Sequence, residues 1–166
     1  MRFLGIDPGL RLTGYGCVET PPEPARRARH GADAVLIEGG VIRLNARLSI
    51  SERLAELDAD LSGIIERLQP DAIAVEKLYA HYKHPTTAIV MGHARGVVLL
   101  NIQRAGIRLI ELGATEVKKS LTGNGHASKD QMQRGVQAQL GLPSPPRPPD
   151  VADAIAIGLC ALRRNT

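Results

Sequence analysis

Residues 71–76 read DAIAVE and follow Pro70. The four apolar residues 72–75 stand between Asp71 and Glu76. A stretch this short and this uniformly apolar is typical of a central strand that is covered on both faces. Before it, leucine and isoleucine recur every three or four residues between 54 and 68, which predicts an amphipathic helix that ends before Pro70. A helix followed by a doubly covered strand indicates an α/β sheet.

The other elements are predicted by working outward from this strand. Residues 2–7 form a short buried strand that the turn-forming sequence Asp7-Pro8-Gly9 brings to an end. The further helices are expected at about 85–104, 128–140 and 150–164, and the further strands at 13–19, 35–44 and 107–112. This order predicts one α/β domain over residues 1–166, with a mixed sheet flanked by helices. The first three strands are antiparallel and the continuation is parallel.

Composition narrows the classes of function. A formal charge of +4 and a pI near 9.4 lean toward a polyanionic partner. With only three tyrosines and one phenylalanine, an extended stacking platform for single strands is not expected. Two cysteines, Cys17 and Cys160, make neither a disulfide framework nor a four-ligand zinc site. No secretory leader or membrane span is recognised, so we expect a cytoplasmic protein.

Four acidic residues lie where predicted strands end or a predicted helix begins. Asp7 ends the first strand and Glu76 ends the most apolar strand, while Asp150 and Asp153 share one face at the start of the last helix. Ligands of α/β sheets gather outside the carboxyl ends of the strands, so these carboxylates are expected to meet. Two carboxylates about 4 Å apart repel by on the order of 4 kcal/mol at an effective dielectric constant near 20. Such a cluster needs protons or divalent cations.

Oxygen-only ligands suit Mg²⁺ or Mn²⁺ and argue against zinc. Two such ions roughly 3.5–4 Å apart can activate a water and stabilise the leaving oxygen of a phosphodiester. The pattern therefore leads to a hypothesis of metal-dependent hydrolysis of a nucleic-acid backbone. Each acid also has a structural explanation that stays open here: Asp7 as a turn residue, Glu76 as a partner of Lys77, and Asp150 with Asp153 as charges favoured by a helix dipole.

Four blocks carry a family resemblance: GIDPGLRLTGYG at 5–16, AVEKLYA at 74–80, GHARGVV at 92–98 and PPDVADAIAIG at 148–158. In order and spacing, over essentially the whole chain, they resemble the RuvC family of bacterial Holliday junction resolvases. The resemblance implies a ribonuclease-H-like fold, a homodimer, and Mg²⁺-dependent cleavage of two like-polarity strands of a four-way DNA junction in recombination and repair. It also implies association with the RuvA–RuvB branch-migration complex.

The resemblance further implies residue roles. The family's catalytic and metal-binding acids fall on Asp7, Glu76, Asp150 and Asp153, with Mg²⁺ or Mn²⁺ as two ions in each active site. Its aromatic residue near the junction centre falls on Tyr79, and its basic DNA-binding residues fall on Lys118 and Lys129, around the GNG turn. The proline- and arginine-rich stretch 20–34 is longer than the family's hairpin, so no role carries over onto it.

One helix feature keeps two interpretations. Ala88, Gly92 and Gly96 form a line of small residues at four-residue spacing. They indicate either close packing of helix 85–104 on the sheet or contact between two copies of this helix across a two-fold axis.

Three rival functions also remain open. The pairing of GIDPG with TGYG resembles the phosphate loop of actin-like sugar kinases and ATPases, which detectable ATP binding would favour. The Asp-x-Gly start is shared with RuvC-like nucleases of pre-ribosomal RNA, which cleavage of structured RNA would favour. A junction-binding protein without catalysis would bind DNA but show no metal-dependent nicking.

Overall fold

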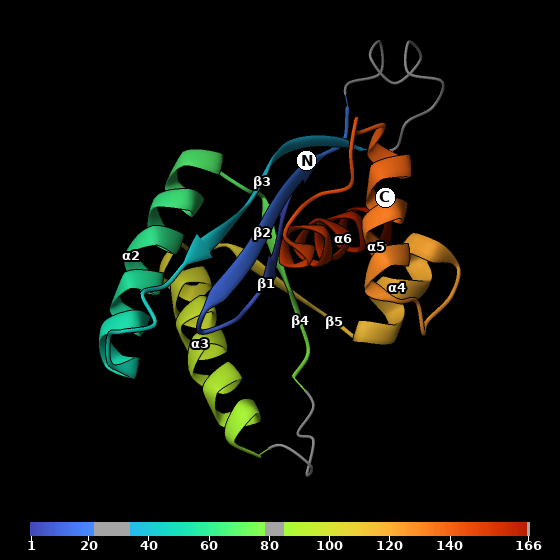
Figure 1. The fold of residues 1–166 in the computed structure, drawn as a ribbon. Helices are drawn as coiled ribbons and strands as arrows, with labels where there is room; N and C mark the ends of the chain where they lie inside the picture. Colours follow the sequence, from blue (N-terminus) through green and yellow to red (C-terminus); the bar gives the residue numbers. More distant parts are fainter. Residues whose placement is uncertain (22–33, 79–84, 166) are drawn as a thin grey trace.

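The computed structural model describes residues 1–21, 34–78 and 85–165 (Figure 1). Tyr79 and most of the stretch 20–34 therefore lie outside the described residues. In chain order the elements are β1 (Arg2–Asp7), β2 (Leu12–Glu19), β3 (Val35–Arg43), α2 (Ile50–Leu68), β4 (Ala72–Glu76), α3 (Pro85–Arg104), β5 (Arg108–Leu112), α4 (Ala114–Thr122), α5 (Lys129–Leu140) and α6 (Pro149–Arg164). Within these ranges, no helix is both long enough and apolar enough to cross a bilayer.

The five strands form one mixed sheet in the order β3-β2-β1-β4-β5. β2 runs antiparallel to both β1 and β3, whereas β4 runs parallel to β1 and to β5. The predicted antiparallel start and parallel continuation are therefore confirmed. Because β3 and β1 are both antiparallel to β2, the carboxyl ends of β1, β3, β4 and β5 all point toward the same edge of the sheet.

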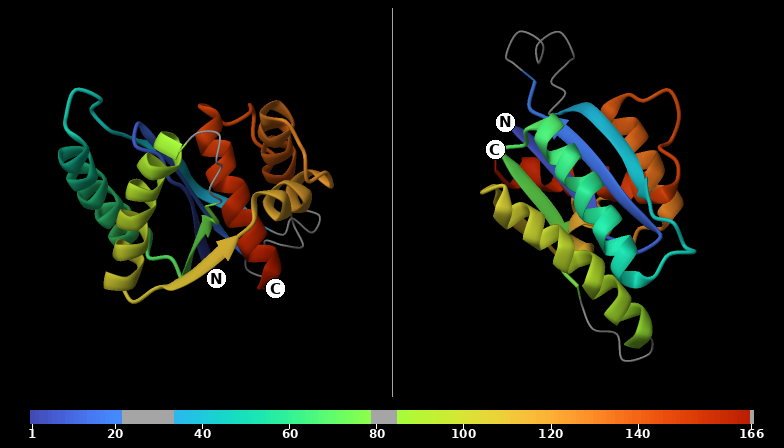
Figure 2. Two further views of the ribbon diagram at one scale, coloured as in Figure 1. Left: turned by 90° about the horizontal axis from the view of Figure 1, so that it is seen from below. Right: turned by 90° about the vertical axis from the view of Figure 1, so that its left-hand side faces the viewer.

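Helices cover both faces of the sheet, with α2 and α3 on one face and α4, α5 and α6 on the other (Figure 2). Side chains alternate between the two faces along each strand. In β1, Leu4 and Ile6 pack in the cluster under α2 and α3, whereas Phe3 packs in the cluster under α6. Asp7 is in phase with Phe3, as Glu76 is with Ala72, so both acids end their strands on the α6 face.

α6 lies directly against β1 and β2 because glycines line its path across the sheet. A β-carbon on Gly5 would lie 2.1 Å from the carbonyl oxygen of Ala154, and one on Gly14 would lie 2.1 Å from that of Asp150. No side chain fits at these distances, so backbone meets backbone. This contact sets the first turn of α6 beside the end of β1.

One helix was not predicted from the sequence. α4 occupies Ala114–Thr122, just before the GNG turn, where the sequence pattern indicates no helix. Its signals are nevertheless present. Val117 and Leu121 are buried at a four-residue spacing, and Gly123 ends the helix in the left-handed conformation at φ 77°. A helix this short shows little more than one turn of apolar periodicity, which is why the pattern is easily missed.

Candidate active site

Two strand ends bring the first two acids together. The parallel pairing of β1 and β4 aligns Ile6 with Val75, so Asp7 and Glu76 stand at the next position on neighbouring strands. Neighbouring strands lie about 4.8 Å apart. Asp153 joins them from the first turns of α6. A cavity of about 210 Å³ lies at this meeting point, and its wall consists of Asp7, Glu76, Ala114, Val117, Lys118, Ala127, Lys129, Met132 and Asp153.

The charge on Asp7 is strongly disfavoured in this cavity. Its pKa is raised from 3.8 to about 7, first because burial removes the carboxylate from water. The nearby negative charges of Asp153, Glu76 and Asp150 add to the shift, and Lys129 opposes it. Near neutral pH, the protonated and ionised forms of Asp7 are therefore both populated.

Burial also raises the pKa values of Glu76 and Asp153. For Glu76 the charge of Asp153 raises the pKa further and Lys118 lowers it. For Asp153 both Lys129 and Lys118 lower the pKa, while Asp150 raises it. In all three acids the upward effects win, so the two lysines moderate the negative charge of the site without cancelling it.

Asp150 occupies a different position from the other three acids. It lies one turn before Asp153 on the same helix and is not part of the cavity wall. Its charge nevertheless acts on both Asp7 and Asp153. The four acids singled out in the sequence are therefore one electrostatic cluster, with three around the cavity and the fourth behind them.

The chemistry of the acid cluster bears on whether it can hold a metal ion. Across the described ranges, no three His, Cys, Asp or Glu side chains are gathered tightly enough to enclose an ion as they stand. The donor chemistry nonetheless fits a hard cation, because all four acids offer only oxygen and the pKa values of three are raised. Unneutralised carboxylates repel one another, which favours a wider spacing than a bound ion would impose.

The two predicted basic residues also reach the cavity, although they come from different elements. Lys118 is half-buried in α4, and Lys129 is the exposed first residue of α5. In the part of the chain that is described, neither forms an ion pair with an acid. Their ammonium groups thus remain available for a phosphate. The wall also includes the apolar side chains of Val117 and Met132, for which the sequence has no signal beyond helix periodicity.

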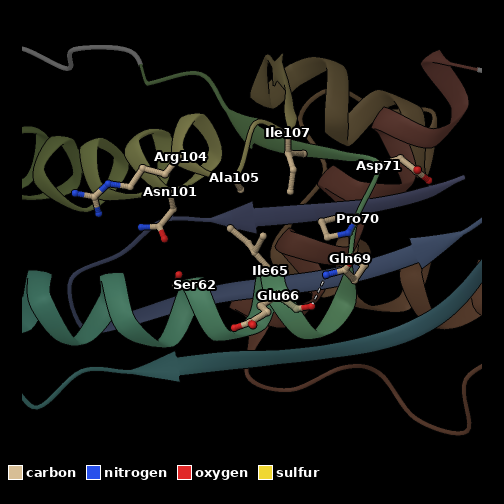
Figure 3. A pocket seen from close by; sticks show the side chains of 10 residues that line it. All are labelled: Ser62, Ile65, Glu66, Gln69, Pro70, Asp71, Asn101, Arg104, Ala105 and Ile107. Atoms are coloured by element: carbon tan, nitrogen blue, oxygen red, sulfur yellow. Dashed lines mark hydrogen bonds between the residues drawn. The ribbon is translucent and has the colours of Figure 1, made fainter.

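A larger cavity, of about 560 Å³, lies at the opposite edge of the sheet between the C-terminal ends of α2 and α3 (Figure 3). Its acids do not form a comparable cluster. The Asp71 carboxylate accepts a hydrogen bond from the backbone N–H of Arg2 at 2.6 Å, and Glu66 lies on α2. Arg104, which also lines it, pairs with Asp58 at 3.3 Å. The smaller cavity is therefore the better candidate for an active site, despite its size.

Comparison with known proteins gives a consistent result. The family model described as Crossover junction endodeoxyribonuclease RuvC matches residues 3–161. A relative of that name from Rhodopirellula baltica is 45% identical over 158 residues, covering 95% of this chain and 84% of the relative. Another, from Caldicellulosiruptor saccharolyticus, is 41% identical over 160 residues, covering 96% of this chain and 91% of the relative.

Solved structures agree with the fold. The structure described as T. thermophilus RuvC in complex with Holliday junction substrate superposes with a TM-score of 0.85 at 32% identity, covering 99% of this chain and 94% of that one. The yeast mitochondrial Holliday junction resolvase Ydc2 has a TM-score of 0.66 at 14% identity, covering 97% and 77%, and so shares the fold. The expected ribonuclease-H-like architecture is thereby confirmed.

Proposed function

Because this chain belongs to the RuvC family of crossover junction endodeoxyribonucleases, we propose that it resolves four-way DNA junctions by cutting their phosphodiester backbone during recombination and repair. The observation that carries the proposal is that Asp7, Glu76 and Asp153 line the same cavity as Lys118 and Lys129. Acids that repel one another beside unpaired ammonium groups suit a site that takes cations and phosphate.

Asp7, Glu76, Asp150 and Asp153 are proposed to hold two Mg²⁺ or Mn²⁺ ions. When bound, these ions would supply the acidity that activates a water and the positive charge that stabilises the leaving oxygen. Asp7, which ends the central strand and is affected by the charges of all three other acids, would hold the ions together with those acids. For this role it must be ionised, and because its pKa is raised to about 7, a bound cation would have to displace the proton that Asp7 partly holds near neutral pH.

Lys118 and Lys129 are proposed to bind the phosphates beside the bond that is cut. They approach the acids from α4 and α5, and their charges already act on the acids. A lysine bound to a phosphate fixes the position of the DNA backbone without reading the bases. Tyr79, which lies outside the described residues, remains the proposed stacking residue near the junction centre.

The exposed face of α3 supports the proposal of a homodimer. Ile89 and Leu100 are 60% and 46% exposed on this helix. A β-carbon on Gly92 or Gly96 would meet nothing within 4 Å, so packing against the sheet does not explain these two glycines. An apolar helix face with small residues suits close contact with a second copy.

A two-fold dimer would present two acid clusters related by the symmetry of a junction with equal arms. Each protomer would then cut one strand, which makes the two nicks symmetric. Association with the RuvA–RuvB complex and a cytoplasmic location are further family expectations that we carry as proposals.

One experiment tests the proposed function against its rivals. The protein is incubated with a synthetic four-way junction, a linear duplex of the same sequence and a structured RNA, each with EDTA, Mg²⁺ or Mn²⁺. Paired nicks confined to the junction and to the metal-containing reactions are expected. Preferential cleavage of the RNA would favour the ribosomal-RNA nuclease, and junction binding without nicks would favour a non-catalytic protein. Binding of ATP would revive the kinase-like alternative.

A further inference from the structure

Three arginines near the active site remain without a role in the proposed chemistry. Arg11 lies in the turn between β1 and β2, Arg43 is the last residue of β3, and Arg47 lies in the loop that leads into α2. All three are exposed, and none forms an ion pair within the described part of the chain. We call these three residues the arginine patch.

Backbone contacts hold the patch together. Arg43 is paired with Leu12 across β2 and β3, next to Arg11, whose carbonyl oxygen accepts a hydrogen bond from the N–H of Leu44 at 3.1 Å. The N–H of Arg47 donates to the side chain of Asn45 at 3.0 Å, which fixes the start of the following loop. The three residues therefore lie on neighbouring segments at one end of the β1–β2–β3 sheet.

No acid neutralises this surface from within. The stretches 8–18 and 39–51, which carry the patch, contain no Asp or Glu. Two carboxylates of α2 lie beside the loop that carries Arg47, but neither forms an ion pair with a patch arginine in the described residues. Glu52 accepts a hydrogen bond from the N–H of Ser49 at 2.8 Å, and Glu56 accepts one from the N–H of Asn45 at 3.1 Å. The three exposed arginines of the patch thus outnumber the two carboxylates beside them.

The patch lies at the same sheet edge as the acids but on the side away from the two lysines. The carboxyl ends of β1 and β3 share this edge, and two strand spacings of about 4.8 Å put Arg43 roughly 10 Å from the end of β1. In Figure 1, β3 and α2 lie to the left of the central strands, whereas α4 and α5 lie to the right. Positive charge therefore flanks the acid cluster on both sides.

We propose that the arginine patch binds the sugar–phosphate backbone of one duplex arm of the substrate as the arm leaves the active site. The inference rests on the proposed function and adds a second DNA contact surface to it. Double-stranded DNA carries one charge per about 1.7 Å of its axis, so roughly 10 Å of duplex presents several phosphates to the patch. Arginine suits this role because its planar guanidinium group binds phosphate through two parallel hydrogen bonds.

The test compares two double variants of equal charge. Arg43→Ala with Arg47→Ala removes two patch cations. Arg104→Ala with Arg108→Ala removes two exposed cations near the opposite sheet edge, where Arg108 begins β5 and Arg104 ends α3. Affinity for a fluorescent four-way junction is measured in EDTA between 50 and 200 mM salt, after thermal unfolding has shown that both variants are folded.

Each lost phosphate contact lowers the slope of log affinity against log salt by about 0.9. For the patch variant we expect a slope lower by about 1.8, so that the same rise in salt weakens the parent about twelvefold more than the variant. The control variant should keep the parental slope. The affinity deficit of the patch variant should fade as the junction arms are shortened.

An unchanged slope in the patch variant, or an equal change in both variants, would overturn the inference. A deficit that persists on the shortest arms would place the contact at the junction centre and would also overturn it. If the parent itself neither binds nor cuts the junction, it is the proposed function that fails.

Discussion

A β-carbon on Gly14 would lie 2.1 Å from the carbonyl oxygen of Asp150, so β2 and the first turn of α6 touch backbone to backbone. Gly14 is also the pairing partner of Asp7 across the β1–β2 ladder. One glycine therefore brings together the acid that ends β1 and the helix that supplies Asp150 and Asp153. The geometry of the acid cluster depends on this contact.

Replacing Gly14 by alanine should disrupt the site and the fold together. The added methyl group must push α6 away from β2, so we expect a lower melting temperature. Cleavage of a four-way junction should fall by at least about tenfold, because a displacement of catalytic groups by about 1 Å is enough to slow a reaction strongly. The matched control is Gly63→Ala on α2, where a β-carbon meets nothing within 4 Å. That change should stabilise the protein by about 0.5–1 kcal/mol. Parental cleavage by Gly14→Ala would contradict this account.

Replacing Asp7 by asparagine should separate cleavage from binding. Asp7 is a proposed ligand of the ions that would stabilise the leaving oxygen. We therefore expect Mg²⁺-dependent cleavage to fall by about a thousandfold or more. Junction affinity in EDTA should be retained or improved, since one repelling carboxylate is gone. Asp60→Asn, at an exposed position of α2, serves as the control and should cut normally. Parental cleavage by Asp7→Asn would show that the assignment of this acid is wrong.

Stability without metal should fall as the pH rises. The pKa of Asp7 is about 7 in the folded protein and near 3.8 when exposed, so between these values the folded state binds the extra proton. The resulting stabilisation is complete below about pH 4 and is lost as the pH rises through 7, with an upper limit of about 4 kcal/mol. Thermal unfolding in EDTA from pH 5 to pH 8 measures it against Asp7→Asn, which should lack this component.

The same proton opposes binding of a cation. Added Mg²⁺ or Mn²⁺ should raise the melting temperature more at pH 8 than at pH 5, because ligands must be deprotonated. A metal-dependent shift of equal size at both pH values would show that Asp7 is not a ligand.

A charge on the exposed face of α3 should separate the dimer. Leu100→Asp places two like charges near the proposed two-fold axis, and we expect sedimentation velocity to show a shift toward monomer at micromolar concentration. Ile37→Asp alters a leucine-sized apolar side chain of similar exposure on β3, away from this helix, and should remain dimeric. If Leu100→Asp still sediments as the parent does, the dimer uses another surface.

Much of the fold and the identity of the candidate acids follow from local sequence patterns. The apolar run 71–76, the leucine repeat before it and the turn after Asp7 each depend on residues that are close in the chain. Periodicity reports which side of an element is buried, and strand ends report where ligands gather. The mixed sheet could be predicted for that reason, as could the meeting of Asp7 and Glu76 at one edge.

Other features depend on contacts between distant segments and could not be predicted in this way. The glycines of β1 and β2 let α6 pack closely on the sheet, and α4, which the sequence pattern does not indicate, brings Lys118 to the cavity wall. Asp150 is not part of that wall, although it lies three residues before Asp153 and therefore on the same side of α6. The spacing of Gly92 and Gly96 likewise fits two interpretations, and only the packing shows that open space lies beside them. Spacing along a chain indicates a shared face, but only the packing of whole elements decides what that face meets.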